Sequence, residues 1–451
     1  MNLLVVGTPG VHRGWPGLVG VGPGQSGLAR ASQGRPGPIE DVPDQSGSSR
    51  TGPRTQALTF GPALCDSTMD FSHGFVDAQG GYSEWGAAAV ADFDGDGVPE
   101  FATGGRGGGF LHLYDYDGGW CRYEVTHAVA PNVGAAPVDV DGDGRPELVF
   151  GEWGPEVLGV SRGGSPGSSR YPGASDKRLF WTTMDPAQAE FGEINHVGGD
   201  FDDPHDVLAA DLDGDGDDEV VVREKDGPLY VYAVSEDPTD AWSRNRLADH
   251  LPGDGTVLVD LTDSGEVDIV TNRGWFENDG TGSFVRRDIP YPDDWHDETR
   301  VAVGDVDDDG IDEVVITESE VDIAARLAVC THAGSGREWE VEVVVDSDRD
   351  RRGLHSLQIA DLDGDGRAEV FSAEMENGKT DGQHRTPEWF VLSERNGTWS
   401  EEVLFDGNLG AHEAKVADFD DDGELEVIGK IWHPNLPNGN GTEHHVSWLD
   451  R

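Results

Sequence analysis

Seven short segments of this chain place acidic residues at alternating positions around a glycine. In residues 92–100 (DFDGDGVPE), acids occupy positions one, three, five and nine, and glycine occupies position six. Alternate acids followed by a turn-forming glycine gather several hard oxygens around one point, which suits Ca²⁺, a cation that takes about 6–8 oxygen ligands. The seven segments begin at Asp92, Asp139, Asp211, Asp260, Asp305, Asp361 and Asp418.

Six of these Asp-rich loops are predicted calcium sites. Position seven would contribute its backbone carbonyl, so its side chain can vary, and position twelve is never acidic, which excludes an EF-hand. In the fourth loop Thr262 and Ser264 replace two carboxylates, so no site is predicted there. The alternative for every copy is an Asp-rich turn without metal. The predicted ligands are Asp92, Asp94, Asp96, Val98, Glu100, Asp139, Asp141, Asp143, Arg145, Glu147, Asp211, Asp213, Asp215, Asp217, Glu219, Asp305, Asp307, Asp309, Ile311, Glu313, Asp361, Asp363, Asp365, Arg367, Glu369, Asp418, Asp420, Asp422, Glu424 and Glu426.

Three histidines share one position relative to these loops. His205, His355 and His412 each stand six residues before the first Asp of a loop, so we expect them at the same height of equivalent strands. Glu152 and Glu374 stand at the ends of the strands that follow two of the loops. Imidazoles with carboxylates could form acid/base pairs, or the histidines could bind a transition metal such as Zn²⁺. Alternatively, each histidine is structural and bonds a strand end.

Short apolar stretches on both sides of each loop predict the elements that position these residues. Runs such as 206–210 before a loop and 219–222 after it are almost wholly apolar, as strands buried on both faces should be. Two further strand-like runs usually follow, which gives four strands in each of seven repeats. The predicted fold is all-β, a seven-bladed β-propeller of four-stranded antiparallel blades. The last repeat is too short, so a strand around 69–76 is expected to complete it and close the ring.

The Asp-x-Asp-Gly-Asp-Gly-x-x-acid pattern resembles the FG-GAP/VCBS repeat family of seven-bladed propellers, which includes the propellers of integrin α-subunits. The resemblance covers residues 70–451 and implies Ca²⁺ in the hairpin between the first two strands of a blade. The pattern of a histidine six residues before the loop, with a charged residue at the end of the second strand, is also similar to that in the propellers of aldos-2-ulose dehydratase and of polysaccharide lyases. That similarity implies removal of a proton α to a carbonyl by histidine with basic or metal groups.

Composition separates the first residues from the rest. Residues 1–60 are rich in Gly, Pro and Ser and are expected to be disordered or non-native, whereas the propeller is expected to span 66–451 with an insertion at 154–177. The sequence contains no run of 18 apolar residues, so no membrane span is predicted. No signal peptide is visible, and three cysteines without metal or redox spacing favour a reducing compartment. We therefore expect a cytoplasmic protein, or an extracellular one if the true start differs.

The chain is strongly acidic, with a net charge of −56 and only five Lys against 27 Arg. The absence of a basic stripe argues against nucleic-acid binding. Acids spread over every repeat are typical of a halophilic protein, whose charge repulsion is screened within about 3 Å in molar salt. Binding of a polycation is the alternative.

Three functions remain open from the sequence. The first is a monomeric, calcium-binding propeller that binds a small polar ligand, a carbohydrate, on the face opposite the Asp-rich loops. The second is a sugar lyase or dehydratase that uses His205, His355 and His412 with Glu374 or Glu152. The third is an interaction scaffold that displays the segments 154–177, 375–386 and 433–443.

Overall fold

The structure is a computed structural model that describes most of the chain from Met69 onward, within one compact unit. The described residues are 69–80, 85–105, 109–153, 177–292, 294–321, 324–375, 386–407, 409–432 and 444–451. The segment 1–60 and the expected insertion, apart from its last residue Lys177, lie outside these ranges. None of the described residues forms a helix with the length and hydropathy of a membrane span.

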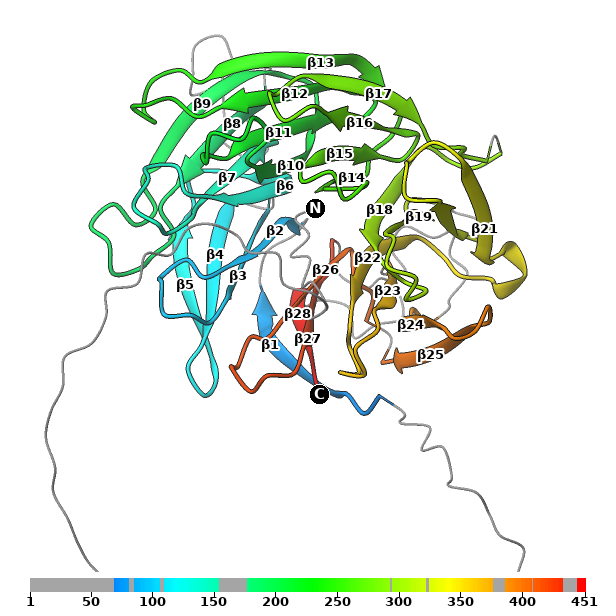
Figure 1. Ribbon diagram of the computed structural model, residues 1–451. Helices are drawn as coiled ribbons and strands as arrows, with labels where there is room; N and C mark the ends of the chain where they lie inside the picture. The colour runs from blue at the N-terminus through cyan, green and yellow to red at the C-terminus, as the bar shows by residue number, and fades with distance from the viewer. Residues whose placement is uncertain are drawn as a thin grey trace, which may run out of the picture. The chain divides into compact units, whose positions relative to one another are not determined.

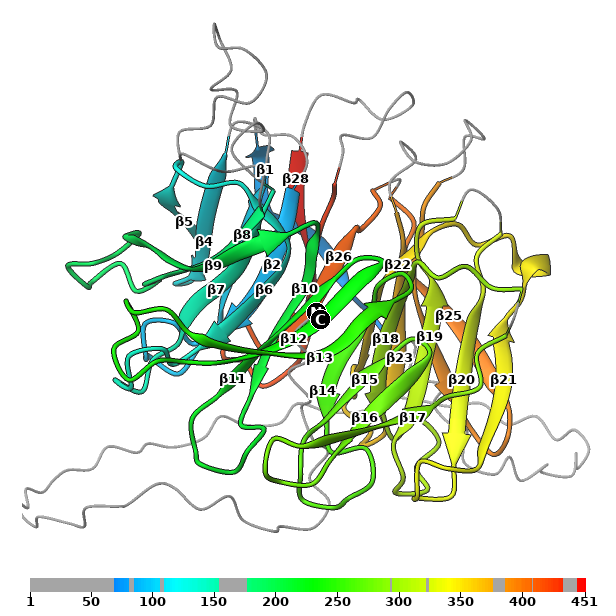
Figure 2. The ribbon, with the colours of Figure 1, turned by 90° about the horizontal axis from the view of Figure 1, so that it is seen from above.

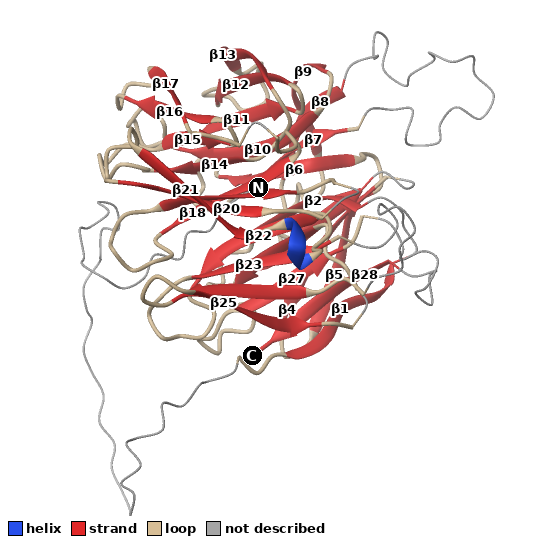
Figure 3. Cartoon of the chain, turned by 90° about the vertical axis from the view of Figure 1, so that its right-hand side faces the viewer, coloured by secondary structure: helices blue, strands red, loops and turns tan. Residues whose placement is uncertain are grey.

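Strands form where the sequence is apolar and β-branched. The strand Glu219–Glu224 and the strand Glu313–Glu318 follow their Asp-rich loops and are buried along their whole length. Val and Ile suit such a pleated, buried surface. Strands farther from the ring axis, such as Trp339–Val345, are largely exposed. Strands and loops make up the described residues, apart from the short 3₁₀ helix Ser347–Arg349 (Figure 3).

The strands pair into seven antiparallel four-stranded sheets, each of which is one blade. Blades 1 to 3 contain β2 (Trp85–Ala91), β3 (Glu100–Gly105), β4 (Phe110–Tyr116), β5 (Trp120–Thr126); β6 (Pro131–Val138), β7 (Glu147–Glu152), β8 (Lys177–Thr182), β9 (Ile194–Phe201); β10 (Pro204–Ala210), β11 (Glu219–Glu224), β12 (Gly227–Ala233) and β13 (Ser243–Leu251). Blades 4 to 6 contain β14 (Thr256–Val259), β15 (Asp268–Thr271), β16 (Gly274–Asn278), β17 (Phe284–Asp288); β18 (Thr299–Gly304), β19 (Glu313–Glu318), β20 (Leu327–His332), β21 (Trp339–Val345); β22 (Leu354–Ala360), β23 (Glu369–Glu374), β24 (Trp389–Glu394) and β25 (Trp399–Phe405).

Blade 7 joins the two ends of the described chain. It contains β26 (Glu413–Ala417), β27 (Glu426–Lys430), β28 (His444–Asp450) and, as its outer strand, β1 (Ser72–Gly80). β1 pairs antiparallel with β28, from Ser72 opposite Asp450 to Gly80 opposite His444. The predicted seven-bladed ring and its closure by an N-terminal strand are confirmed (Figure 1).

The apolar core lies between the blades. Among the described residues, seven clusters of buried apolar side chains each join two neighbouring blades, and together they run around the whole ring. One of them packs Trp85 and Phe110 of blade 1 against Ile428 and Val446 of blade 7. Because each blade is packed on both sides, the ring has no seam without a core.

The antiparallel order places the loops on two faces. The first strand of each blade lies nearest the ring axis and the fourth lies outermost (Figure 1). The strands run between the two faces, as the side view shows (Figure 2). The Asp-rich loops join first and second strands and therefore share one face, which we call the loop face. The starts of first strands and the ends of second strands share the other, the mouth face.

Candidate functional site

The Asp-rich loops are turned tightly by their own carboxylates. In the first loop, Asp92 accepts hydrogen bonds from the backbone N–H groups of Gly95 (2.7 Å) and Gly97 (3.0 Å). These glycines have φ of 80° and 100°, a left-handed conformation that glycine adopts at little cost. In the other six copies, the backbone N–H of the glycine at position six likewise donates a hydrogen bond to the carboxylate of the Asp at position one.

The acid at position nine holds each loop in place through a backbone hydrogen bond. It is buried, and one of its oxygens accepts a hydrogen bond from the N–H of the second loop residue, as between Glu100 and Phe93 (2.7 Å). In the six intact loops, burial and, to a smaller degree, the neighbouring Asp carboxylates raise the pKa of this acid. The pKa is raised to about 7 in Glu147, Glu219 and Glu369, and to about 8 in Glu100, Glu313 and Glu426.

The donors gathered in these loops fit Ca²⁺. In the first and the seventh loop, all four acids offer oxygen atoms that lie within 4.8 Å of one another, and three acids of the second loop do the same. Within the described part of the chain, Asp361 Oδ1, Asp420 Oδ1 and Glu426 Oε1 are buried without a hydrogen-bond partner. Converging carboxylate oxygens without other donors match the oxygen ligands that Ca²⁺ prefers. A bound ion would supply the charge that offsets their mutual repulsion.

The fourth loop keeps the fold of the others with fewer charges. Asp260 accepts bonds from the N–H groups of Ser264 (2.9 Å) and Gly265 (2.6 Å), so the turn is made without the two missing carboxylates. At position nine, Asp268 accepts from the backbone of Leu261 (3.2 Å) and Asn278 (2.8 Å). This loop shows that the turn itself does not need four acids.

On the mouth face, His205 in blade 3 lies between two carboxylates. Its Nδ1 donates to Asp206 Oδ1 at 2.8 Å, and its Nε2 lies 3.4 Å from Asp254 Oδ2. Asp206 also accepts from the Thr256 hydroxyl at 2.8 Å. The pKa of Asp254 is lowered although burial alone would raise it, because Arg300 and His205 stabilise the carboxylate.

His355 in blade 6 continues this network. Its Nδ1 donates to the backbone carbonyl of His412, so its Nε2 carries the lone pair, which accepts a bond from Arg300 Nη2 at 2.5 Å. Arg300 Nη1 in turn donates to Asp254 Oδ2 at 3.0 Å. Burial, together with the Arg300 charge, lowers the pKa of His355 to about 3, so its ring is neutral.

His412 extends the network to blade 7 and back to blade 1. Its ring stacks on that of His355, with centroids 3.7 Å apart. Its Nδ1 accepts a bond from the Lys430 ammonium at 3.2 Å, since an ammonium can only donate. Lys430 also donates to the carbonyls of Trp85 (2.8 Å) and Gly86 (2.5 Å) in blade 1.

These buried side chains form a continuous series of contacts from blade 3 through blade 7 to blade 1, which we call the polar belt. Local backbone irregularity aims its histidines. His205 and His355 are each the extra residue of a bulge in the pairing of a first strand with a second strand, and bulges re-aim side chains. The polar belt consists of Asp206, His205, Asp254, Arg300, His355, His412 and Lys430.

A less buried layer of charged groups adjoins the polar belt. Lys225 Nζ lies 2.8 Å from Glu298 Oε1 and 3.5 Å from Glu320 Oε2, and these side chains are 17%, 35% and 18% exposed respectively. Glu320 Oε1 also lies 3.5 Å from His355 Nε2, which links the two layers. Trp432 packs against His412 with ring centroids 4.9 Å apart, and Trp153 packs against Trp432.

Glu374 and Glu152 lie at the ends of second strands, as expected, but no described contact joins them to the polar belt. Glu374 accepts bonds from the backbone of Arg352 (2.8 Å) and Glu388 (3.0 Å) and pairs with Arg351 at 3.3 Å. Glu152 is buried in blade 2, and this burial raises its pKa to about 7 against the opposing effect of Arg178. The histidines therefore have other carboxylates as neighbours.

Sequence reasoning missed Asp206, Asp254, Arg300 and Glu320. Asp206 follows His205 directly, and Asp254 has the same offset from its loop as the three histidines, so a comparison of equivalent positions could have found both. Arg300 and Glu320 have no such signal. Trp275, which follows the second strand of blade 4, lies in the core between blades 4 and 5 and not at the mouth face.

Comparison with known families identifies the repeats. The FG-GAP-like repeat family matches residues 92–150 and 361–429, which contain the first, second, sixth and seventh Asp-rich loops. This chain carries FG-GAP-like repeats. The FG-GAP-like loops therefore occur on both sides of the point where β1 closes the ring.

The solved structures that resemble this FG-GAP-like propeller are distant, and no curated protein matches its sequence. The WD40 β-propeller domain of Doa1 is 11% identical with a TM-score of 0.44, and the match covers 84% of this chain and 97% of that domain. The exotype rhamnogalacturonan lyase YesX is 14% identical, with a TM-score of 0.46 and coverages of 82% and 72%. A mutant NanB sialidase from Streptococcus pneumoniae is 9% identical, with a TM-score of 0.41 and coverages of 85% and 71%.

The hydrogen bonds of the FG-GAP-like propeller limit the chemistry of its mouth. Glu320, His355 and His412 offer ligand atoms within 4.8 Å of one another. The lone pair of His355 Nε2 already accepts from Arg300, however, and that of His412 Nδ1 accepts from Lys430. Two cations thus lie where Zn²⁺ would approach these two nitrogen atoms, so the hydrogen bonds as they stand do not favour the predicted metal site. The mouth is better suited to hold a polar molecule through charged donors and acceptors.

Proposed function

We propose that this FG-GAP-like propeller is a calcium-stabilised binding protein that takes a small polar ligand, a carbohydrate, on its mouth face. The observation that carries the proposal is the polar belt, which fixes charged groups from several blades beneath one mouth. Three of the chain's five lysines, Lys225, Lys415 and Lys430, are gathered there although the protein is strongly acidic. Such a concentration of scarce positive charges favours a ligand role over general solubility.

The ligand would meet the half-buried layer first. Lys225, Glu298 and Glu320 supply donors and acceptors that match sugar hydroxyl groups, and Trp153, which packs against Trp432, supplies an aromatic surface on the same face. Aromatic residues combine an apolar face with a polar edge, which suits the mixed surface of a sugar ring. The polar belt beneath would hold this layer in place, since a pre-organised site loses less entropy on binding.

Binding is favoured over catalysis by the state of the histidines. A general base works best when its pKa is near the working pH, whereas His355 has its pKa lowered to about 3 by burial and by Arg300. A lyase or dehydratase is the second candidate, and the pKa of Glu152, raised to about 7 by burial, is the observation that favours it. Such an enzyme would rely on Glu152 rather than on the three histidines.

Binding to an array of neutral and uronic-acid oligosaccharides, in buffer with Ca²⁺, tests the proposal. We expect a subset of the sugars to bind, and Lys225→Met and Glu320→Gln to weaken that binding at least about 10-fold, since charge-assisted hydrogen bonds contribute about 1.5–3 kcal/mol. Arg286→Met, which changes an exposed side chain of the outer strand β17, is the matched control and should bind as the wild type does.

Two results would count against the proposal. One is an array without any bound sugar, and the other is binding that survives both mouth substitutions. Release of an unsaturated product from a bound sugar, lost in Glu152→Gln but kept in His355→Ala, would replace the binding function with the lyase. Metal analysis after dialysis tests the calcium part separately, with about six ions per chain expected from the six intact loops.

A further inference from the structure

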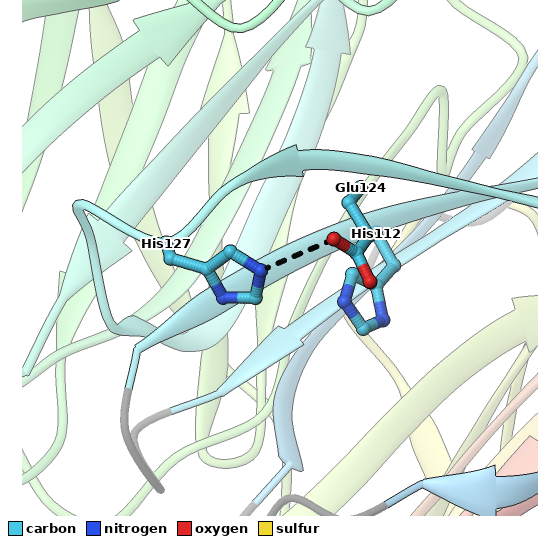
Figure 4. A group of neighbouring side chains, drawn as sticks. All are labelled: His112, Glu124 and His127. Carbon is cyan, nitrogen blue, oxygen red and sulfur yellow. Dashed lines mark ion pairs between the residues drawn. The ribbon is translucent and has the colours of Figure 1, made fainter.

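Blade 1 brings two histidines and a glutamate together far from the ring axis. His112 lies in β4, Glu124 in the outer strand β5, and His127 just after β5. Each offers a ligand atom, and these atoms lie within 4.8 Å of one another. Figure 4 shows the three side chains turned toward one another, with the Glu124 carboxylate beside both rings. This cluster belongs neither to an Asp-rich loop nor to the polar belt.

Strand pairing explains why the three side chains meet. His112 is directly opposite Glu124 in the pairing of β4 with β5, and opposite residues on one face have Cβ atoms about 4.5–5.5 Å apart. A register shift follows, because Leu111 pairs with Thr126 and leaves Val125 as an extra residue. The chain then turns so that His127, three residues after Glu124, reaches the same carboxylate.

Hydrogen bonding prepares His127 as a ligand. Its Nδ1 donates to the backbone carbonyl of Gly109 at 3.1 Å, which directs Nε2 toward Glu124 Oε2 at 3.6 Å. Metal-binding histidines almost always donate their other ring N–H to a carbonyl or a carboxylate in this way. Two ligands of a tetrahedral Zn²⁺ with bonds of 2.0–2.1 Å lie about 3.3 Å apart, so the observed distance needs little adjustment.

The other two residues are equally suited. His112 is fully buried and lies directly opposite Glu124, so its ring is held in place beside that carboxylate. Arg122 Nη2 lies 3.6 Å from Glu124 Oε1, but its Nη1 donates to Asp77 at 2.8 Å, which offsets part of its charge. The second oxygen of Glu124 faces His127. Two imidazoles and one carboxylate are a set that suits Zn²⁺, unlike the all-oxygen loops.

We propose that His112, Glu124 and His127 bind a transition-metal ion, Zn²⁺ by their chemistry, at the mouth-face end of blade 1. Three protein ligands leave one position of a tetrahedral ion for water or for an exogenous group. The site would tie β4 to the end of β5 and to the segment after it. Glu124 and His127 are exposed there, whereas His112 in β4 is buried. The ion would therefore bind at the protein surface, with one of its ligands fixed in the interior.

Titration of the full chain with Zn²⁺, and with Co²⁺ as a spectroscopic substitute, tests this site in the presence of excess Ca²⁺ to fill the Asp-rich loops. We expect the wild type to bind one ion with a tetrahedral Co²⁺ absorption band. His127→Ala and Glu124→Gln should each lose that equivalent or weaken it at least about 10-fold, a loss that even outer-shell changes produce. His250→Ala, at another exposed histidine, should bind as the wild type does.

Unchanged Zn²⁺ stoichiometry and affinity in both His127→Ala and Glu124→Gln would overturn the site. So would loss of the ion in His355→Ala alone, because the metal would then bind at the polar belt. Both blade 1 substitutions alter exposed side chains, and their melting temperatures without Zn²⁺ should equal that of the wild type. If the melting temperatures are equal, a loss of Zn²⁺ binding comes from the missing ligand side chain and not from unfolding.

Discussion

The rings of His355 and His412 stack with centroids 3.7 Å apart and an angle of 28° between their planes. They belong to neighbouring blades, and each has a cation at one ring nitrogen, Arg300 for His355 and Lys430 for His412. Two imidazoles can approach this closely only if they do not both carry a charge. Hydrogen bonds from these cations fix the orientation of both rings, so the stack connects blades 6 and 7.

Removal of the Arg300 charge should destabilise the propeller strongly. Arg300→Met leaves Asp254 buried without its main cation, and breaking one side of a buried ion pair costs about 3–5 kcal/mol. The double variant Asp254→Asn with Arg300→Met should recover a large part of that loss, because no buried charge remains unpaired. Urea unfolding of both variants measures the coupling. Equal losses in the two variants would show that Asp254 does not depend on Arg300.

Calcium should stabilise the ring through the intact loops and not through the fourth. A ligand present at 100 times its Kd stabilises the folded state by about 2.7 kcal/mol per site. Asp363→Asn with Asp365→Asn should therefore lower the melting temperature in Ca²⁺, whereas Asp263→Asn in the fourth loop should not. In a calcium chelator the double variant should be as stable as the wild type or more so, because carboxylate repulsion is relieved. A deficit that persists in chelator would contradict the calcium proposal.

Asp268 gives the fourth blade a pH dependence of defined sign. Burial raises its pKa from 3.8 to about 6, against the opposing hydrogen bonds from Asn278 and Leu261. Between pH 4 and pH 6 the folded state then holds this proton more tightly than the unfolded state. Stability should fall as the pH rises through this window, by up to about 3 kcal/mol from this group. The difference between wild type and Asp268→Asn in urea unfolding isolates the effect, and identical slopes would refute it.

Salt should stabilise the protein by screening its own charge. The net charge is −56, and molar salt reduces the range of charge repulsion to about 3 Å. With Ca²⁺ held constant, the melting temperature should rise from low salt to molar KCl, and NaCl should act equally. A melting temperature that is independent of ionic strength would argue against the halophilic interpretation of the composition.

The fold could be predicted because the Asp-rich loops mark the same hairpin in every blade. Once Asp211 and Glu219 are aligned with Asp361 and Glu369, the strands on either side follow from their apolar runs. The need for β1 followed from the short seventh repeat, since four strands were required and only three were visible. Both inferences depend on local sequence and on a repeat count.

The site was only partly predictable because its contacts join different blades. The equal offset of His205, His355 and His412 gave their height, but the bulges that aim two of them leave no mark in the sequence. Arg300 belongs to a blade without such a histidine, and it contacts His355 only once blades 5 and 6 pack together. The cluster of His112, Glu124 and His127 likewise depends on a register shift at Val125.

The pairing of β1 with β28 has a consequence for how the protein is made. β1 precedes every other described strand in the sequence, yet its partner β28 follows all of them. At translation rates of about 5–20 residues per second, the ribosome needs roughly 20–75 s to make the chain between them. During that interval β1 has an unpaired edge, which can pair with a strand of another nascent chain. Completion of β28 thus decides whether the ring closes on itself or on a neighbour.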